Sequence, residues 1–220
     1  MQQFTILGER CTGTHFLQYA IQQNFKIPYY RGAKHFFGHN DDIEYTDEII
    51  DKTIFFVLVR HPVDWVDSFY KRLHHVPQEN KKDIDSFLTN EWYSIYEEGS
   101  KKNTEIMEDR NIETKERYTN IFEMRKGKHN YLINILPSKV KKFCIVKYED
   151  LRDDYENTLD RISRELNLVK KESPYAKIIK YKGSFNALYY KKPILLPNSI
   201  QYKIEQNVDI EQEKILGYSF

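Results

Sequence analysis

The fold is decided by the stretch Phe4-Thr5-Ile6-Leu7-Gly8-Glu9-Arg10-Cys11-Thr12-Gly13-Thr14. A short apolar run leads into a loop bounded by glycines, and a helical pattern follows, with apolar residues at Phe16, Leu17 and Ala20. Glycine lets a backbone turn tightly and approach an anion, and the first turn of a helix offers free N–H groups and the positive end of the helix dipole. The order strand, loop, helix therefore predicts a site for a phosphate-like group.

The side chains of this loop refine that prediction. Thr12 and Thr14 add hydroxyl groups, and Arg10 adds a permanent charge. The spacing is that of a nucleoside triphosphatase loop, but Thr14 stands where the lysine belongs and His15 where the magnesium-binding Ser or Thr belongs. A magnesium-dependent triphosphatase or kinase is disfavoured. The alternative is an ordinary turn from strand to helix, in which the glycines and threonines serve geometry alone.

Further apolar runs predict the other strands of a sheet. They lie at Ala33–Phe36, which is weak, at Thr53–Val59 and at Phe143–Val146. The run at 54–59 is apolar on both faces, as expected of a central strand covered by helices on both sides. A helix follows the last run, with Asp153 or Asp154 as its cap. Strands that alternate with helices predict an α/β domain with a mainly parallel sheet.

The middle of the chain has a different character. Residues 73–141 are rich in charge and carry helical patterns at Ile84–Tyr96 and Tyr131–Leu136. We interpret this stretch as a helical insertion or lid within one domain that spans residues 1–220. An irregular segment with Pro193 and Pro197 precedes a last predicted helix at Asp209–Leu216.

Composition excludes several classes of protein. The 34 basic and 33 acidic residues nearly cancel, so a general grip on nucleic acid is not indicated. The two cysteines, Cys11 and Cys144, offer neither a disulfide framework nor a zinc cluster. No apolar run reaches the roughly 18 residues that span a bilayer, and no leader precedes the first strand. We expect a cytoplasmic protein without nucleic-acid or membrane partners; its oligomeric state is open.

A second anion anchor follows the most apolar run. Arg60 lies at the carboxyl end of that strand, where ligands bind in open α/β sheets. Pro62 suits the first turn of a helix, and Ser68 lies about two turns further on. Guanidinium matches phosphate through paired donors and a permanent charge. Taken singly, Arg60 could equally be a surface ion pair and Ser68 an ordinary helical serine.

The loop Thr12-Gly13-Thr14-His15-Phe16 resembles the Ser-Gly-Thr-Thr-Trp loop of sulfotransferases. It is most similar to a divergent subgroup whose loop begins Gly-Glu-Arg and continues with Ser/Thr-Gly-Thr-Asn. The resemblance implies that residues 10–15 hold the 5′-phosphosulfate of 3′-phosphoadenosine 5′-phosphosulfate (PAPS). One departure concerns the basic residue before the Ser-Gly pair, because Cys11 stands there and Arg10 lies one step earlier.

The same resemblance assigns further contacts with the nucleotide. It implies that Arg60 and Ser68 hold the 3′-phosphate. The Tyr148-Glu149-Asp150-Leu151 segment resembles one found late in many sulfotransferases, and we interpret its carboxylates as structural. Lys182-Gly183 lies where the family places an Arg-Lys-Gly segment that touches the 3′-phosphate, although a solvated lysine-rich loop is the alternative.

The general base is predicted from the pair Lys34-His35. This pair resembles the Lys-Ser/Thr-His element of cytosolic sulfotransferases, without its middle residue. Histidine titrates near neutrality and suits the task. We expect His35 to be the base and Lys34 to stabilise the leaving group, with His39 and His15 as alternative bases. A structural histidine is the competing interpretation, and other branches of the family use a glutamate.

Together these features predict a P-loop-nucleotidase-like sulfotransferase. It would move a sulfonate from PAPS to a hydroxyl or amine by in-line displacement, release 3′-phosphoadenosine 5′-phosphate (PAP), and require no metal. The acceptor is open among small molecules, carbohydrates and peptides. The alternatives are a kinase-like phosphotransferase of the same fold, and a non-catalytic protein that binds a 3′-phosphonucleotide.

Overall fold

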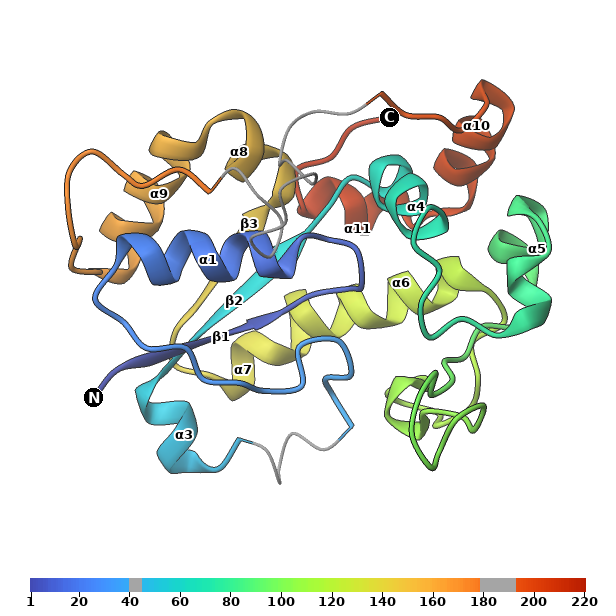
Figure 1. Cartoon of the computed structure of the whole chain (residues 1–220), viewed down its shortest axis with the longest axis horizontal. Helices are drawn as coiled ribbons and strands as arrows, with labels where there is room; N and C mark the ends of the chain where they lie inside the picture. Colours follow the sequence, from blue (N-terminus) through green and yellow to red (C-terminus); the bar gives the residue numbers. More distant parts are fainter. Residues whose placement is uncertain (40–44, 179–192) are drawn as a thin grey trace. The chain divides into compact units, whose positions relative to one another are not determined.

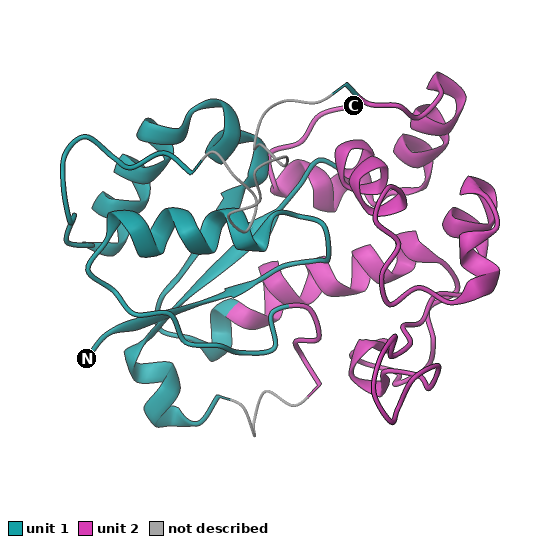
Figure 2. Cartoon of the chain, in the orientation of Figure 1, with its two compact units in different colours: residues 1–34, 42–61, 137–193 teal, residues 35–41, 62–136, 194–220 magenta. Residues whose placement is uncertain are grey.

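The structure is a computed structural model that describes residues 1–39, 45–178 and 193–220 (Figure 1). The chain forms two compact units, shown in different colours in Figure 2. Unit 1 comprises residues 1–34, 42–61 and 137–193, and unit 2 comprises residues 35–41, 62–136 and 194–220. The interpretation of residues 1–220 as one domain with an insertion at 73–141 stays a prediction.

Unit 1 is built on a parallel sheet of three strands within the described residues, in the order β1-β2-β3. The strands are β1 (Gln3–Leu7), β2 (Thr53–Val59) and β3 (Phe143–Lys147). Every residue of β2 is buried, which confirms the prediction of a central strand. Leu7 is in register with Val57, and Val59 is in register with Lys147, so the strands end close to one another.

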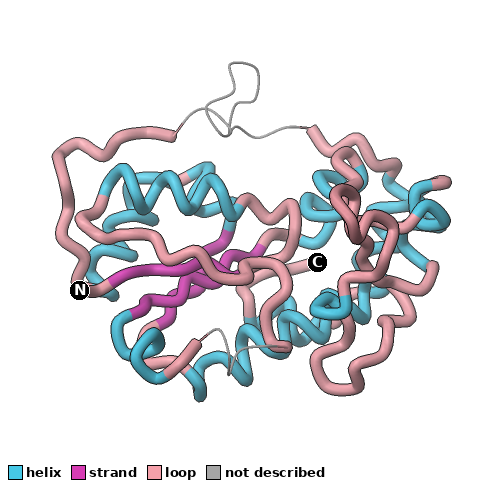
Figure 3. Tube along the Cα trace, turned by 60° about the horizontal axis from the view of Figure 1, so that its bottom comes forward, coloured by secondary structure: helices cyan, strands magenta, loops and turns pink. Residues whose placement is uncertain are grey.

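Helices of unit 1 cover this sheet. They are α1 (Thr14–Asn24), α3 (Asp47–Lys52), α8 (Tyr148–Asp153) and α9 (Tyr155–Leu166), with the short α7 (Leu136–Lys139) at the boundary of the unit. Apolar residues of α1 and α9 form one core cluster with residues of all three strands. Figures 1 and 3 show both helices on the same side of the sheet. The predicted α/β class, with a parallel sheet flanked by helices, is confirmed.

The predicted strand at Ala33–Phe36 is wrong, because these residues form no strand. Residues 28–34 instead run beside β1 as an irregular segment, in which Tyr30 donates to the Phe4 carbonyl at 2.7 Å. Pro28 has no N–H to donate, and the Lys34 N–H turns back to the Gly32 carbonyl at 2.9 Å. A regular ladder would need those donors, so the edge of the sheet stays irregular.

The short helix α8 follows β3 directly, and α9 begins after it at Tyr155, with Asp154 in the N-cap position. The Asp154 side chain makes no capping bond to the backbone. Its carboxylate instead accepts from the Asn157 side-chain amide at 2.8 Å. The cap predicted at Asp153 or Asp154 is therefore right in position but not in its hydrogen bond.

Unit 2 is helical in its described residues. Its elements are α4 (Pro62–Tyr70), η1 (Gln78–Lys81), α5 (Ile84–Thr89), η2 (Met107–Asp109), α6 (Ile121–Asn130), the π-helical η3 (Tyr131–Ile135), α10 (Asn198–Asn207) and α11 (Ile210–Ile215). The final helix is confirmed, and Asp209 caps it by accepting from the Gln212 N–H at 3.1 Å. The helix predicted over 84–96 ends at Thr89, because Trp92 pairs its backbone with Tyr118.

Buried ion pairs hold unit 2 together. Arg125 donates to both carboxylate oxygens of Glu213, at 2.6 and 2.9 Å, and the two side chains are 2% and 1% exposed. Lys128 donates to the buried carboxylate of Asp109. Such charges are tolerated inside a protein only when they are paired. Breaking one of these pairs should therefore destabilise the unit strongly.

Candidate functional site

The carboxyl ends of three neighbouring parallel strands define the candidate site. Gly8 follows β1, Arg60 follows β2, and Tyr148 follows β3. Because the strands are parallel and in register, these three positions lie together at the carboxyl ends of the strands, all within unit 1. This is the edge at which ligands bind in open α/β folds.

The loop after β1 takes a conformation that few residues favour. Cys11 has a φ of 63° and Gly13 a φ of 101°, both in the left-handed region. Thr12 stabilises the turn, because its N–H donates to the Glu9 carbonyl at 3.3 Å and its hydroxyl donates to the same oxygen at 2.7 Å. The Thr12 hydroxyl, expected to serve a ligand, thus gives its proton to the loop itself.

The amino end of α1 carries open backbone donors. Within the described residues, the N–H groups of Gly13 and Thr14 make no hydrogen bond. Gly13 is the N-cap residue and supplies no side chain to bond the first turn. Successive N–H groups beside left-handed residues form a concavity for anions, and the helix dipole adds to the attraction. The loop is therefore suited to hold a phosphate or sulfonate oxygen.

The Tyr148 ring packs directly against this loop. A Cβ atom placed on Gly13 would lie 2.5 Å from Tyr148 Cδ2, so only glycine fits beside the ring. The Arg60 guanidinium lies over the same ring, 4.3 Å from its centroid, and its Nη1 donates to the Cys11 carbonyl at 2.9 Å. The Tyr148 ring therefore packs against the backbone at Gly13, and Arg60 holds the Cys11 carbonyl by a hydrogen bond.

Sequence reasoning had grouped Tyr148 with a structural segment and had not assigned it this contact. The available signal was its place directly after a strand that neighbours β2. Glu149, the next residue, accepts from the His61 N–H at 3.0 Å, and Asp150 lies 3.5 Å from the Lys147 ammonium. These contacts agree with the structural role predicted for the two carboxylates.

Lys34 lies beside the loop. Its carbonyl accepts from the Gly8 N–H at 2.9 Å, which ties its backbone to the start of the loop. Its ammonium lies 3.1 Å from Nε2 of His15, the second residue of α1. The structure thus brings together Lys34, His15 and the loop, three features that the sequence had assigned to the site separately.

Arg10 and Cys11 differ in exposure. Arg10 is 1% exposed, and so is Glu9 beside it, so the charge of Arg10 lies inside unit 1. Cys11 is partly buried. A direct contact of Arg10 or Cys11 with a nucleotide stays a prediction.

Other predicted residues belong to the second unit or lie outside the described residues. Arg60 belongs to unit 1 and Ser68 to unit 2, on α4, so their joint hold on a 3′-phosphate stays a prediction. Lys182 and Gly183 lie outside the described residues.

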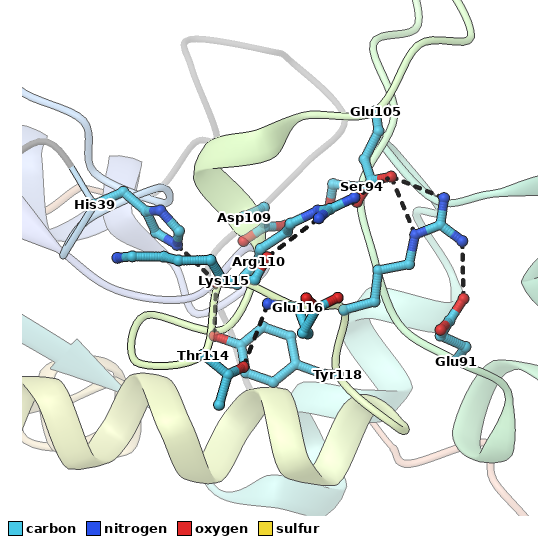
Figure 4. A network of polar contacts seen from close by, with 11 residues as sticks. His39, Glu91, Ser94, Glu105, Asp109, Arg110, Thr114, Lys115, Glu116 and Tyr118 are labelled. Atoms are coloured by element: carbon cyan, nitrogen blue, oxygen red, sulfur yellow. Dashed lines mark hydrogen bonds and ion pairs between the residues drawn. The ribbon is translucent and has the colours of Figure 1, made fainter.

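The candidate bases of unit 2 are held by their backbones or rings. The Lys128 ammonium donates to the His35 carbonyl at 2.8 Å, which fixes the His35 backbone and leaves its ring to other contacts. His39 Nε2 donates to the Arg110 carbonyl at 2.9 Å, an oxygen that also accepts from the Tyr118 hydroxyl at 3.1 Å (Figure 4). This bond joins His39 to the network, and its role as an alternative base stays a prediction.

The same network carries a carboxylate between two guanidinium groups. Glu105 accepts from Arg110 at 2.8 Å and from Arg117 at 2.8 Å (Figure 4). The neighbouring guanidinium groups lower the pKa of the Glu105 carboxyl against the opposing effect of its burial. The network thus stabilises the loops between α5 and α6.

Across residues 1–39, 45–178 and 193–220, no group of three or more His, Cys, Asp or Glu side chains is arranged to hold a metal ion. Over the same ranges, no helix has the length and apolar character that crossing a membrane requires.

No protein-family model matches the chain, and no curated protein matches it. Among solved structures, the chain is similar to mouse sulfotransferase SULT7A1 complexed with PAP, at 12% identity and a TM-score of 0.40. That match covers 97% of this chain and 66% of the mouse chain, just under two thirds of its length.

Proposed function

We propose that this chain is a sulfotransferase that takes a sulfonate from PAPS and passes it to a hydroxyl or amine. The observation that carries the proposal is the loop after β1, with open N–H groups at Gly13 and Thr14 and without the lysine of triphosphatases. Its donors suit an anion without a bound magnesium ion.

The residues around the loop fit a phosphosulfate group. Gly13 and Thr14 N–H groups would hold its oxygens, and the Lys34 ammonium would add charge beside them. Arg60 is fixed over Tyr148 next to the loop and would meet the nucleotide's 3′-phosphate together with Ser68. Each of these groups donates hydrogen bonds, which suits the phosphosulfate and the 3′-phosphate because their oxygens are acceptors.

The reaction itself needs little from the protein beyond position and charge. The acceptor oxygen or nitrogen forms a bond to sulfur as the bond from sulfur to the bridging phosphate oxygen breaks. The acceptor's proton passes to a base, for which His35 is our proposal, and Lys34 with the loop N–H groups stabilises the phosphate that leaves. Small molecules, carbohydrates and peptides all offer suitable acceptors.

Calorimetric titration separates this proposal from a kinase. We expect PAP to bind more tightly than ATP with magnesium, because the loop lacks the lysine and magnesium ligand that ATP needs. Arg60→Gln should weaken PAP binding by about ten- to hundredfold, since hydrogen bonds to charged groups contribute about 1.5–3 kcal/mol. Arg164→Gln, which changes an exposed arginine on α9, is the matched control. Failure of PAP to bind would end the proposal.

Turnover separates an enzyme from a non-catalytic binder. Labelled PAPS is incubated with a panel of alcohol, sugar, tyrosine-peptide and amine acceptors, and transfer is counted for the wild-type chain and for His35→Ala. We expect transfer by the wild type and a loss of about a hundredfold or more in the variant. Equal rates would remove His35 as the base, and binding without transfer to any acceptor would favour the non-catalytic protein.

A further inference from the structure

The candidate anion loop lacks a positive charge at the position where a triphosphatase carries its lysine. Thr14 occupies that position, and the basic residue usual before the Ser-Gly pair of the sulfotransferase loop is replaced by Cys11. Backbone donors alone attract an anion less strongly than they do with an ammonium beside them. A cation from elsewhere in unit 1 would complete the site.

Lys34 is the candidate, because its ammonium lies 3.1 Å from His15, the residue after Thr14. Its backbone is fixed by the hydrogen bond from the Gly8 N–H, so its side chain starts at the mouth of the loop. A lysine side chain is long and flexible, and it loses rotamer freedom when it is held in one place. A partner that holds the ammonium before a ligand arrives would reduce that cost on binding.

His15 is that partner. Its Nε2 lies 3.1 Å from the Lys34 ammonium, which can donate but not accept. When the ammonium donates to Nε2, the ring accepts as a neutral imidazole with its proton on Nδ1. The ring lies against Tyr19, with centroids 6.2 Å apart and planes at 27°, so its orientation is set by packing on α1.

His15 is also in the right place along the helix. It directly follows Thr14, whose N–H is one of the open donors of the loop. An ammonium held by His15 therefore lies at the same end of α1 as those donors. His15 supplies geometry and Lys34 supplies charge.

We propose that His15 is a positioning residue that holds Lys34 as the cation of the anion loop, in place of the lysine that the loop lacks. This inference rests on the proposed function for the identity of the nucleotide, but the pair would act on any phosphate-like anion at the loop. It differs from a role of His15 as a base, because the imidazole acts through Lys34 and not on the acceptor.

Calorimetry on four variants tests the inference, with PAP and inorganic pyrophosphate as separate probes. His15→Leu removes the acceptor, His15→Gln keeps one on an uncharged side chain, and Lys34→Met removes the charge at similar length. The fourth variant combines His15→Leu with Lys34→Met. Gln18→Leu is the matched control, because it replaces a partly buried polar residue of α1 whose side chain donates to Gln22 on the same helix.

We expect His15→Leu to weaken binding by about tenfold relative to the wild type, and His15→Gln to keep most of the wild-type affinity. Lys34→Met should weaken binding by about ten- to hundredfold. The double variant should bind as Lys34→Met does, since a positioning residue has nothing left to position. Gln18→Leu should bind as the wild type does. Thermal unfolding of each variant verifies that it is folded.

Three results would overturn the inference. They are wild-type affinity in His15→Leu, no recovery in His15→Gln, and losses from His15→Leu and Lys34→Met that add in the double variant. The last result would mean that His15 contacts the ligand directly. If the wild type binds pyrophosphate but not PAP, the proposed function fails and the pyrophosphate data decide the role of His15. Binding of neither probe refutes both.

Discussion

Replacing Gly13 with alanine tests whether Tyr148 and the loop form one rigid site. Gly13 has a φ of 101°, and an added Cβ would lie 2.5 Å from Cδ2 and 2.8 Å from Cε2 of Tyr148. The left-handed backbone alone costs about 1–2 kcal/mol for a residue with a Cβ. The close contact adds about 1–3 kcal/mol, the usual cost of overpacking. We expect a total loss of about 2–5 kcal/mol in the free energy of unfolding.

The ring cannot easily move aside to relieve the contact. Tyr148 is 7% exposed, and the Arg60 guanidinium lies 4.3 Å from its centroid. Phe16 packs against it edge to face, with centroids 6.1 Å apart. Gly13→Ala should therefore lose the full cost of overpacking in the free energy of unfolding. A flexible surface side chain in place of Tyr148 would move aside and remove that cost.

Urea denaturation measures this loss, and the chain offers a matched control for the backbone term. Gly99 has a φ of 75°, and a Cβ there would meet nothing within 4 Å. Gly99→Ala should lose only about 1–2 kcal/mol. Tyr148→Leu combined with Gly13→Ala should recover about 1–3 kcal/mol relative to the sum of the single variants. If Gly13→Ala loses no more than Gly99→Ala, or if the double variant shows no coupling, the argument for a rigid platform is refuted.

Three further predictions concern buried groups. Burial, with the Arg125 charge nearby, holds the pKa of His129 well below its ordinary 6.5. Glu213 Oε1 lies 3.8 Å from His129 Nδ1, but its charge is taken up by Arg125, so the downward direction holds. Below about pH 6.5 the unfolded chain binds a proton at His129 that the folded chain does not, so stability falls by up to about 1.4 kcal/mol per pH unit. The free energy of unfolding, measured by urea denaturation at about pH 7.5 and 5.5, should change less between the two pH values in His129→Gln than in the wild type. An equal change in both proteins contradicts the prediction. Arg125→Met leaves Glu213 buried without its partner and should cost about 3–5 kcal/mol, whereas adding Glu213→Leu should recover much of that; a single-variant loss below about 1 kcal/mol would show that the pair is solvated. Burial raises the pKa of the Cys144 thiol to about 11, so a thiol reagent at about pH 8 should label Cys11 first, as mass spectrometry of the native protein can verify, and equal rates at both cysteines would speak against it.

Much of the fold of unit 1 follows from the sequence. The apolar run at 54–59 predicted a strand buried on both faces, and the apolar spacing of Phe16, Leu17 and Ala20 predicted the packed face of α1. These patterns are local, and they hold because each strand or helix must bury its own apolar face. The segment at 33–36 failed the same reasoning, because Pro28 and the turn at Gly32 remove the donors of a regular edge.

The site was predicted only in its parts. The glycine-bounded loop, Lys34, His15 and Arg60 could each be named from the sequence. Their contacts could not, because they depend on how parallel strands and the segment beside β1 bring distant residues together. Lys34 and His15 are 19 positions apart, and their pairing follows from the path of residues 28–34 along β1.

The sequence by itself determined that a strand leads into a glycine-bounded loop without a lysine and then into a helix. Only the tertiary structure decided three contacts. The Tyr148 ring packs against Gly13, Arg60 donates to the Cys11 carbonyl, and the Lys34 ammonium lies beside His15. The physical reason is that residue type and spacing set local backbone conformation. The register of three parallel strands sets which of their ends meet, and that register depends on packing across the whole sheet.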